Sequence, residues 1–251
     1  MRRALLLLLV AVPAWPLDSE QTKYLNKLFE ESARIQAEPK DPIYAGLPGE
    51  LARDYPEREG FVRFEHIAGD VPPIGGRVRF SDPELKLTDV FDDESWARLP
   101  DGQKILRDTS GPREIWDYPV GTRVVHRILL KSDPRKLFEL RLAQKLPDGK
   151  WGFGLYREED GPANLPLHRD GMPPLSFDVK IKAKVVRVDM FRLSPASCRN
   201  CHFRMGHGGY QSPDVDHVGP CGFSPPNPRL LTDWADAYQG RYGYAPFALR
   251  P

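Results

Sequence analysis

Three residues near the C-terminal end have the most specific chemical pattern in the chain. Cys198, Cys201 and His202 form a C-x-x-C-H motif. In such a motif the two thiols add to the vinyl groups of a haem, and the adjacent histidine binds the iron. The spacing puts both sulfurs along one edge of the macrocycle, with His202 beneath the iron as the proximal ligand. The motif therefore predicts one covalently bound haem c.

Other uses of the same thiols stay open. A zinc site could combine Cys198 and Cys201 with His207, His217 or Cys221. A redox-active C-x-x-C pair would favour a thioredoxin-like βαβ setting, whereas this motif follows predicted strands. A structural disulfide between the first two thiols is the simplest alternative. The total of three cysteines is odd, so at least one has a use other than a disulfide.

The main candidates for the ligand on the other side of the iron are histidines, with a Cys221 thiolate as a weaker alternative. Met205 is the one methionine after His202 and follows it by three residues, which puts it on the same side of the haem. His126 shares a predicted strand face with apolar residues, and a buried imidazole needs a polar partner or a metal. His126 is therefore a candidate distal ligand, with His207 and His217 as less favoured candidates. A core histidine bonded to backbone is the alternative for His126.

Alternating residues predict a mainly antiparallel β-sheet that places these groups. Val124, His126, Ile128 and Leu130 would share one face of a strand at 123–131. The same pattern predicts that Phe138, Leu140 and Leu142 share a face opposite Glu139 and Arg141. A turn at 147–150 predicts a meander into 151–156, and further short strands are expected at 61–64, 77–80 and 177–185. The phase slip at Val185–Val186 predicts a bulge.

Helices are expected only near the two ends. One would begin at Asp18 or Ser19 and end near Ala37, and a short one would cover 230–239. Residues 39–60 are rich in Pro, Gly and charge, which predicts a linker or irregular chain. The 26 prolines disfavour a helical bundle. The fold class expected is thus α+β, with an N-terminal helix and linker at 18–60 and a β-rich haem domain at 61–251.

The first 16 residues have the pattern of a secretory signal. Arg2 and Arg3 precede an apolar run from Ala4 to Val12 that is too short to span a bilayer. Such a signal predicts a periplasmic or otherwise exported protein, and its cleavage would leave the mature protein without a membrane span. The remaining 34 basic and 35 acidic residues are balanced, which argues against a nucleic-acid-binding protein.

A series of short motifs ahead of the cysteines resembles one known group. The segments are Arg79–Asp82, Ala97–Gly102, Ile115–Thr122, Phe138–Leu142 and Asp148–Trp151, followed by Cys198–His202. Their order is similar to that in exported bacterial c-type haem proteins of the cytochrome P-460 and c-prime-beta group. The resemblance covers roughly residues 79–205 and implies a β-domain followed by a C-terminal haem motif.

The resemblance also bears on His126. In the cytochrome P-460 group a lysine shortly after a Gly-Thr pair approaches the haem, and in the enzymes it is cross-linked to it. Counted from Gly121–Thr122, that position is His126 here. The resemblance thus implies that His126 lies over the haem and disfavours hydroxylamine oxidation.

Two functions follow as expectations. The first is a monohaem cytochrome that passes electrons to a redox partner protein, favoured if a histidine completes the iron. The second is a five-coordinate haem that binds or reduces a small molecule such as nitric oxide or peroxide. The sequence leaves open whether the protein is an enzyme. A zinc-stabilised interaction domain remains the third alternative.

Overall fold

The computed structural model of the chain describes residues 46–65, 78–82, 84–111, 114–131, 136–149, 151–157, 164–169, 175–181, 184–190, 223 and 228–251. These all belong to one compact unit that begins at Asp41. Several predicted features lie outside the described residues. They are the signal at 1–16, the helix expected to end near Ala37, the motif at Cys198–His202, and the residues His207, His217 and Cys221.

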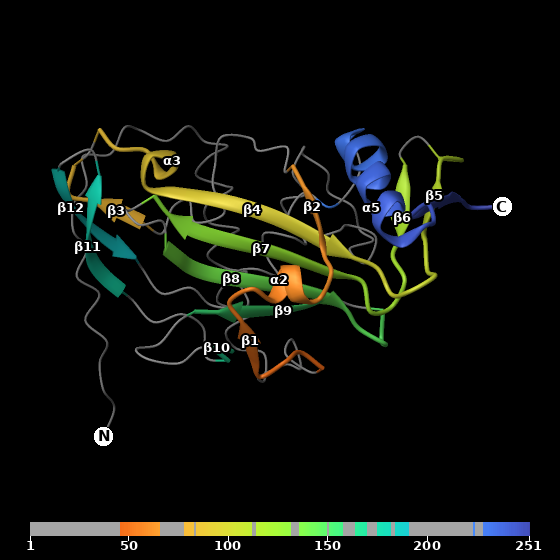
Figure 1. Cartoon of the computed structure of the whole chain (residues 1–251), viewed down its shortest axis with the longest axis horizontal. Coiled ribbons are helices and arrows are strands. Elements are labelled where there is room, and N and C mark those ends of the chain that lie inside the picture. The colour runs from red at the N-terminus through yellow and green to blue at the C-terminus, as the bar shows by residue number, and fades with distance from the viewer. Residues whose placement is uncertain are drawn as a thin grey trace, which may run out of the picture. The chain divides into compact units, whose positions relative to one another are not determined.

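A five-stranded antiparallel sheet is the largest element (Figure 1). Its strands, in spatial order, are β2 (Val62–Phe64), β4 (Phe91–Arg98), β7 (Arg123–Leu130), β8 (Lys136–Lys145) and β9 (Trp151–Tyr156). Strands β7, β8 and β9 are neighbours in the order of the sequence, which confirms the predicted meander. The turn between β8 and β9 contains Gly149 at a φ of 82°, in the left-handed region where glycine costs least.

Three smaller sheets accompany it. The first contains, in spatial order, β11 (Leu175–Ile181), β12 (Lys184–Met190) and β3 (Val78–Phe80). The second contains β13 (Phe247–Leu249), β5 (Ile105–Asp108) and β6 (Ile115–Asp117). The third consists of β1 (Glu50–Ala52) and β10 (Asn164–Pro166). The short helical segments are α2 (Tyr55–Arg58), α3 (Leu87–Val90), η3 (Leu230–Trp234) and α5 (Ala235–Tyr242). Mostly antiparallel strands with few helices make the described part a β-rich α+β fold. Among these residues no helix is long and apolar enough to cross a membrane.

Three local expectations are wrong. β11 and β12 pair without a register shift, so the Val185–Val186 bulge is absent from this hairpin. A shift occurs instead between β7 and β8, where Ile128 pairs with Glu139 and Leu129 pairs with Leu137. Beyond that shift Phe138 joins the apolar cluster of Ile128, whereas Leu140 and Leu142 join that of Val125. Glu139 and Arg141 do lie opposite Leu140 and Leu142, and Glu139 is buried there. Residues 50–58, expected as irregular chain, form β1 and α2.

The large sheet is covered on both faces. On one face, Val125 and Leu142 pack with Leu51, Tyr55 and Phe61, so residues from the expected linker complete this core. The other face has two apolar clusters, one near each end of the strands. We call them the helix-end cluster, which contains Val124, Ala143, Trp151, Phe223 and Trp234, and the hairpin-end cluster, which contains Phe91, Ile128, Leu130, Val188 and Met190.

The C-terminal helix closes the helix-end cluster. Its predicted position is confirmed, since η3 and α5 run from Leu230 to Tyr242. The Trp234 indole donates to the Val62 carbonyl at 3.2 Å, and Tyr238 donates to the Leu99 carbonyl at 3.4 Å. Burial raises the pKa of Tyr238, so its hydroxyl remains a donor at neutral pH. These aromatic residues therefore pack back on the domain.

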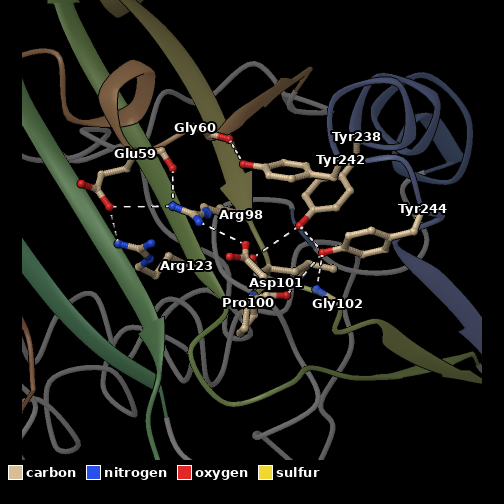
Figure 2. Close-up of polar contacts among 11 residues, drawn as sticks. Glu59, Gly60, Arg98, Pro100, Asp101, Gly102, Arg123, Tyr238, Tyr242 and Tyr244 are labelled. Carbon is tan, nitrogen blue, oxygen red and sulfur yellow. Dashed lines mark hydrogen bonds and ion pairs between the residues drawn. The ribbon is translucent and has the colours of Figure 1, made fainter.

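Figure 2 shows how the end of this helix joins the tip of β4. The Tyr242 hydroxyl donates to the Gly60 carbonyl, and the Gly102 amide donates to the Tyr244 hydroxyl at 2.9 Å. Beside them, Arg98 lies between the carboxylates of Glu59 and Asp101. These polar contacts connect three distant parts of the sequence at one corner of the fold.

Glu114 provides a pH-dependent contribution to this end of the molecule. Its carboxylate accepts hydrogen bonds from Arg107 and, at 2.6 Å, from the Trp116 indole. The hydrogen bond from Arg107 is the largest cause of a pKa below the usual value. Stability from this group is therefore fully present above the unfolded pKa of about 4.3 and is lost as pH falls through the lower folded pKa.

We expect Glu114→Gln to lower the free energy of unfolding by about 1 to 2 kcal/mol at pH 7. The difference from the parent protein should shrink as the pH falls below about 4, because the parent carboxylate then becomes protonated. Urea unfolding at pH 7 and pH 3 measures both values. Glu84→Gln at an exposed position is the matched control. A deficit that is unchanged at pH 3 would contradict the charge-based explanation.

Candidate functional site

His126 lies in the middle of β7 and is 1% exposed. Val124, Ile128 and Leu130 on alternating positions of the strand are buried as well, as the sequence predicted. In the antiparallel pairing, Ser95 of β4 is opposite His126 on one side and Arg141 of β8 is opposite it on the other. Residues that are directly paired project from the same face of a sheet. A polar row therefore crosses three central strands.

The neighbouring strand β4 supplies a carboxylate to the histidine. Asp93 Oδ2 lies 2.9 Å from His126 Nε2, close enough for a hydrogen bond. The Asp93 side chain is 38% exposed, whereas the imidazole is buried. A carboxylate beside one ring nitrogen fixes the orientation of the ring and, with the proton on that nitrogen, directs the other nitrogen to act as an acceptor or metal ligand.

A buried ion pair continues the row on β8. Arg141 Nε donates to the Glu139 carboxylate, and the two side chains are 12% and 1% exposed. Glu139 is paired with Ile128, so it projects from the same face as His126. We refer to Asp93, Ser95, His126, Glu139 and Arg141 as the polar band. It lies between the helix-end and hairpin-end clusters, which is an expensive place for charged groups unless they are paired or bind something.

Ser95 gives the clearest sign that the polar band accommodates a further group. Its hydroxyl is buried and has no hydrogen-bond partner among the residues that the structure describes. A buried hydroxyl without a partner costs about 1 to 3 kcal/mol. Such a cost is typical of sites where a ligand completes the hydrogen bonding. The band therefore fits a polar or metal-containing ligand placed over His126.

The segment that contains the cysteine motif is attached to this same face at both ends. Met190, before the segment 191–222, is buried in the hairpin-end cluster. Phe223, after it, is buried in the helix-end cluster, and Tyr118 donates to its backbone carbonyl at 2.6 Å. The polar band lies between these two attachment points. Chain connectivity thus relates the motif to His126, although His126 and His202 are far apart in the sequence.

The sequence pattern did not identify several residues of the polar band as members of the candidate site. Asp93 and Ser95 were missed because three successive acidic residues, Asp92 to Glu94, hid the strand β4. Glu139 and Arg141 were recognised as the polar side of a strand, but the pattern does not show that Glu139 on this side is buried. The useful signal was His126, since an imidazole on an apolar strand face requires polar neighbours on the adjoining strands.

Within the described ranges, no group of three or more His, Cys, Asp or Glu side chains is arranged to hold a metal ion. These ranges do not include the predicted haem or zinc ligands Cys198, Cys201, His202, His207, His217 and Cys221. The chain has no match among protein-family models, curated proteins or solved structures.

Proposed function

We propose that this chain is an exported monohaem c-type cytochrome with a cytochrome P-460-like fold. Haem c is attached through Cys198 and Cys201, His202 is the proximal iron ligand, and His126 is the distal ligand. Residues 1–16 act as the export signal, and a helix from residue 18 to about 37 precedes the β-rich domain. The single observation that carries the proposal is the buried His126, on the sheet face to which both ends of the motif segment are attached.

The polar band has the chemistry that a distal ligand needs. A histidine that binds a metal usually donates its other ring N–H to a carboxylate. Asp93 contacts Nε2 of His126, so the nitrogen that would hold the iron is Nδ1. When bound, the haem supplies a one-electron ferric/ferrous couple, and the surrounding protein sets its potential through burial and hydrogen bonds. The function is electron transfer to a partner protein.

A pyridine haemochrome assay tests the proposal directly. The protein is produced in a host that matures c-type cytochromes, and covalent haem is measured after acid–acetone extraction. The expected result is one haem per chain that stays with the polypeptide. A chain that carries no covalent haem and binds one zinc ion would overturn the proposal in favour of the zinc-stabilised domain.

A second function is favoured by the buried Ser95 hydroxyl, which has no hydrogen-bond partner among the described residues. If the His126 imidazole does not reach the iron, the haem is five-coordinate. The Ser95 hydroxyl and the Arg141 guanidinium then lie beside His126 as donors to a small molecule such as nitric oxide or peroxide. This variant of the proposal keeps the haem and replaces electron transfer by ligand binding or reduction.

Replacement of His126 separates the two functions. For the cytochrome, His126→Ala should convert a low-spin ferric spectrum to a high-spin one that responds to cyanide, because a coordination position opens. His168→Ala is the control, since that half-buried histidine lies outside the polar band. A parent spectrum that is already high-spin would support the five-coordinate haem. A low-spin spectrum retained in His126→Ala would assign the distal position to another residue, with His207 and His217 as the next variants.

A further inference from the structure

Asp93 and His126 meet from neighbouring strands of the large sheet. Asp93 on β4 is paired with Ile128, and His126 lies two residues before Ile128 on β7. The two side chains are therefore diagonal neighbours on one sheet face, within reach of each other. Their contact at 2.9 Å joins positions 33 residues apart in the sequence. It forms only when β4 and β7 are paired, so the fold itself delivers the carboxylate to the imidazole.

The backbone around Asp93 is held on both sides. β4 pairs with β7 without a register shift over its whole length. Val90 and Phe91, where this strand begins, are buried, and the Lys131 amide donates to the Val90 carbonyl at 2.8 Å. The Asp93 amide donates to the Asp92 carboxylate at 3.1 Å. Rotation about its own side-chain bonds is thus the main freedom left to the Asp93 carboxylate.

The two partners differ in their exposure to solvent. The His126 side chain is 1% exposed, whereas that of Asp93 is 38% exposed. A carboxylate that keeps part of its hydration carries a negative charge at modest cost, and a buried imidazole is least costly in its neutral form. A neutral imidazole has one N–H, which Asp93 can accept from Nε2. The lone pair then lies on Nδ1, the nitrogen that would bind the iron.

Such a carboxylate changes the strength of a metal-binding imidazole. Accepting the N–H raises the basicity of the other ring nitrogen. A more basic nitrogen favours ferric over ferrous iron, because the ferric ion has one more positive charge, and the negative charge of the carboxylate acts in the same direction. The strand β4 thus supplies a group that acts on the iron without touching it.

We infer that Asp93 is a positioning residue that lowers the haem potential and strengthens the bond between His126 and the iron. The inference rests on the proposed function, in which His126 is the distal ligand. It goes beyond that function by assigning to one carboxylate the control of the ferric/ferrous equilibrium and of access to the distal position.

Asp93→Asn in the haem-loaded full chain, at pH 7, tests the inference. The amide keeps the size of the side chain and an oxygen acceptor but removes the charge. The equilibrium constant for reduction, obtained from the midpoint potential, should rise about tenfold. Carbon monoxide, which competes with His126 for the ferrous iron, should bind about tenfold more tightly. Because carbon monoxide is neutral, the loss of a nearby charge does not by itself explain a tighter complex.

Two further variants separate the contact from a general effect of charge. Asp93→Glu keeps the charge and moves the carboxylate by one methylene, so both values should lie between those of the parent and those of Asp93→Asn. Asp92→Asn is the matched control, because Asp92 is paired with Leu129 and projects from the opposite sheet face. It removes the same charge one residue away and keeps an oxygen that can accept from the Asp93 amide. Both values should stay close to those of the parent.

The outcomes distinguish this inference from the function on which it rests. If Asp93→Asn retains covalent haem and both values match the parent, the inference fails and the cytochrome stands. Equal shifts in Asp93→Asn and Asp92→Asn would also overturn it, since net charge alone would then account for the effect. A high-spin parent spectrum would remove His126 from the iron and the inference with it. If the parent protein carries no covalent haem, the proposed function itself fails.

Discussion

Replacing both Cys198 and Cys201 by alanine should reduce covalent haem to background in a host that matures c-type cytochromes. In the proposed cytochrome each thiol forms one thioether bond to the macrocycle, so the double variant would have no point of attachment. Either single variant retains one bond and should give a lower yield with a shifted haemochrome band. Acid–acetone extraction followed by the pyridine haemochrome spectrum, normalised to protein, measures all three. This is the largest effect we expect for any substitution in the chain.

Cys221→Ala is the matched control for that experiment. It removes the third thiol and leaves the C-x-x-C-H spacing intact, so covalent haem should match the parent level. The zinc alternative makes the opposite prediction, because Cys221 is one of its ligands beside Cys198 and Cys201. Loss of a bound zinc ion in Cys221→Ala, with no haem in the parent protein, would therefore contradict the cytochrome.

The strand of His126 could be predicted from the sequence because its pattern is local. Val124, His126, Ile128 and Leu130 alternate with period two, and each is buried in the structure. The turn before Trp151 and the C-terminal helix were likewise encoded by neighbouring residues. These are the elements for which local preference and tertiary packing agree.

The strand β4 could not be predicted because the residues that stabilise it are distant in the sequence. Its residues Asp92, Asp93 and Glu94 have poor strand preference. In the structure Asp93 contacts His126, and the Glu94 carboxylate accepts from Arg127 on the adjoining strand β7. The compensating groups are distant in the chain, so no local window contains the pair. The partners of the candidate site were hidden for the same reason.

Glu139 illustrates a second limit of sequence patterns. Alternation separates the two faces of a strand without showing whether the polar face meets solvent or another layer. Here both faces of the large sheet are covered, and Glu139 and Arg141 pair inside. The register shift between β7 and β8 leaves Phe138 as the extra residue, and Phe138 joins the hairpin-end cluster, which a strictly period-two pattern does not predict.

The buried pair gives the second large effect. We expect Glu139→Gln to lower the free energy of unfolding by about 3 kcal/mol, at the lower end of the range for breaking one side of a buried ion pair. The Gln side chain keeps the volume, so the cost arises from the Arg141 guanidinium that loses its carboxylate. Urea unfolding of parent and variant, each with the same haem content, measures the difference. Asp178→Asn is the control, because its partner Arg187 is exposed, and such pairs contribute about 0 to 1 kcal/mol.

A double variant shows whether Glu139 and Arg141 contribute only to stability, as a buried pair of charges, or also act on His126. Replacing both partners, as Glu139→Leu with Arg141→Met, removes two buried charges together, and the stability should return to within about 1 kcal/mol of the parent. If the polar band serves the haem, this stable double variant should still alter the ferric spectrum or its response to cyanide, because Arg141 is opposite His126. Recovered stability with an unchanged spectrum would assign the pair to folding alone and leave Asp93 and Ser95 as the groups that act on His126.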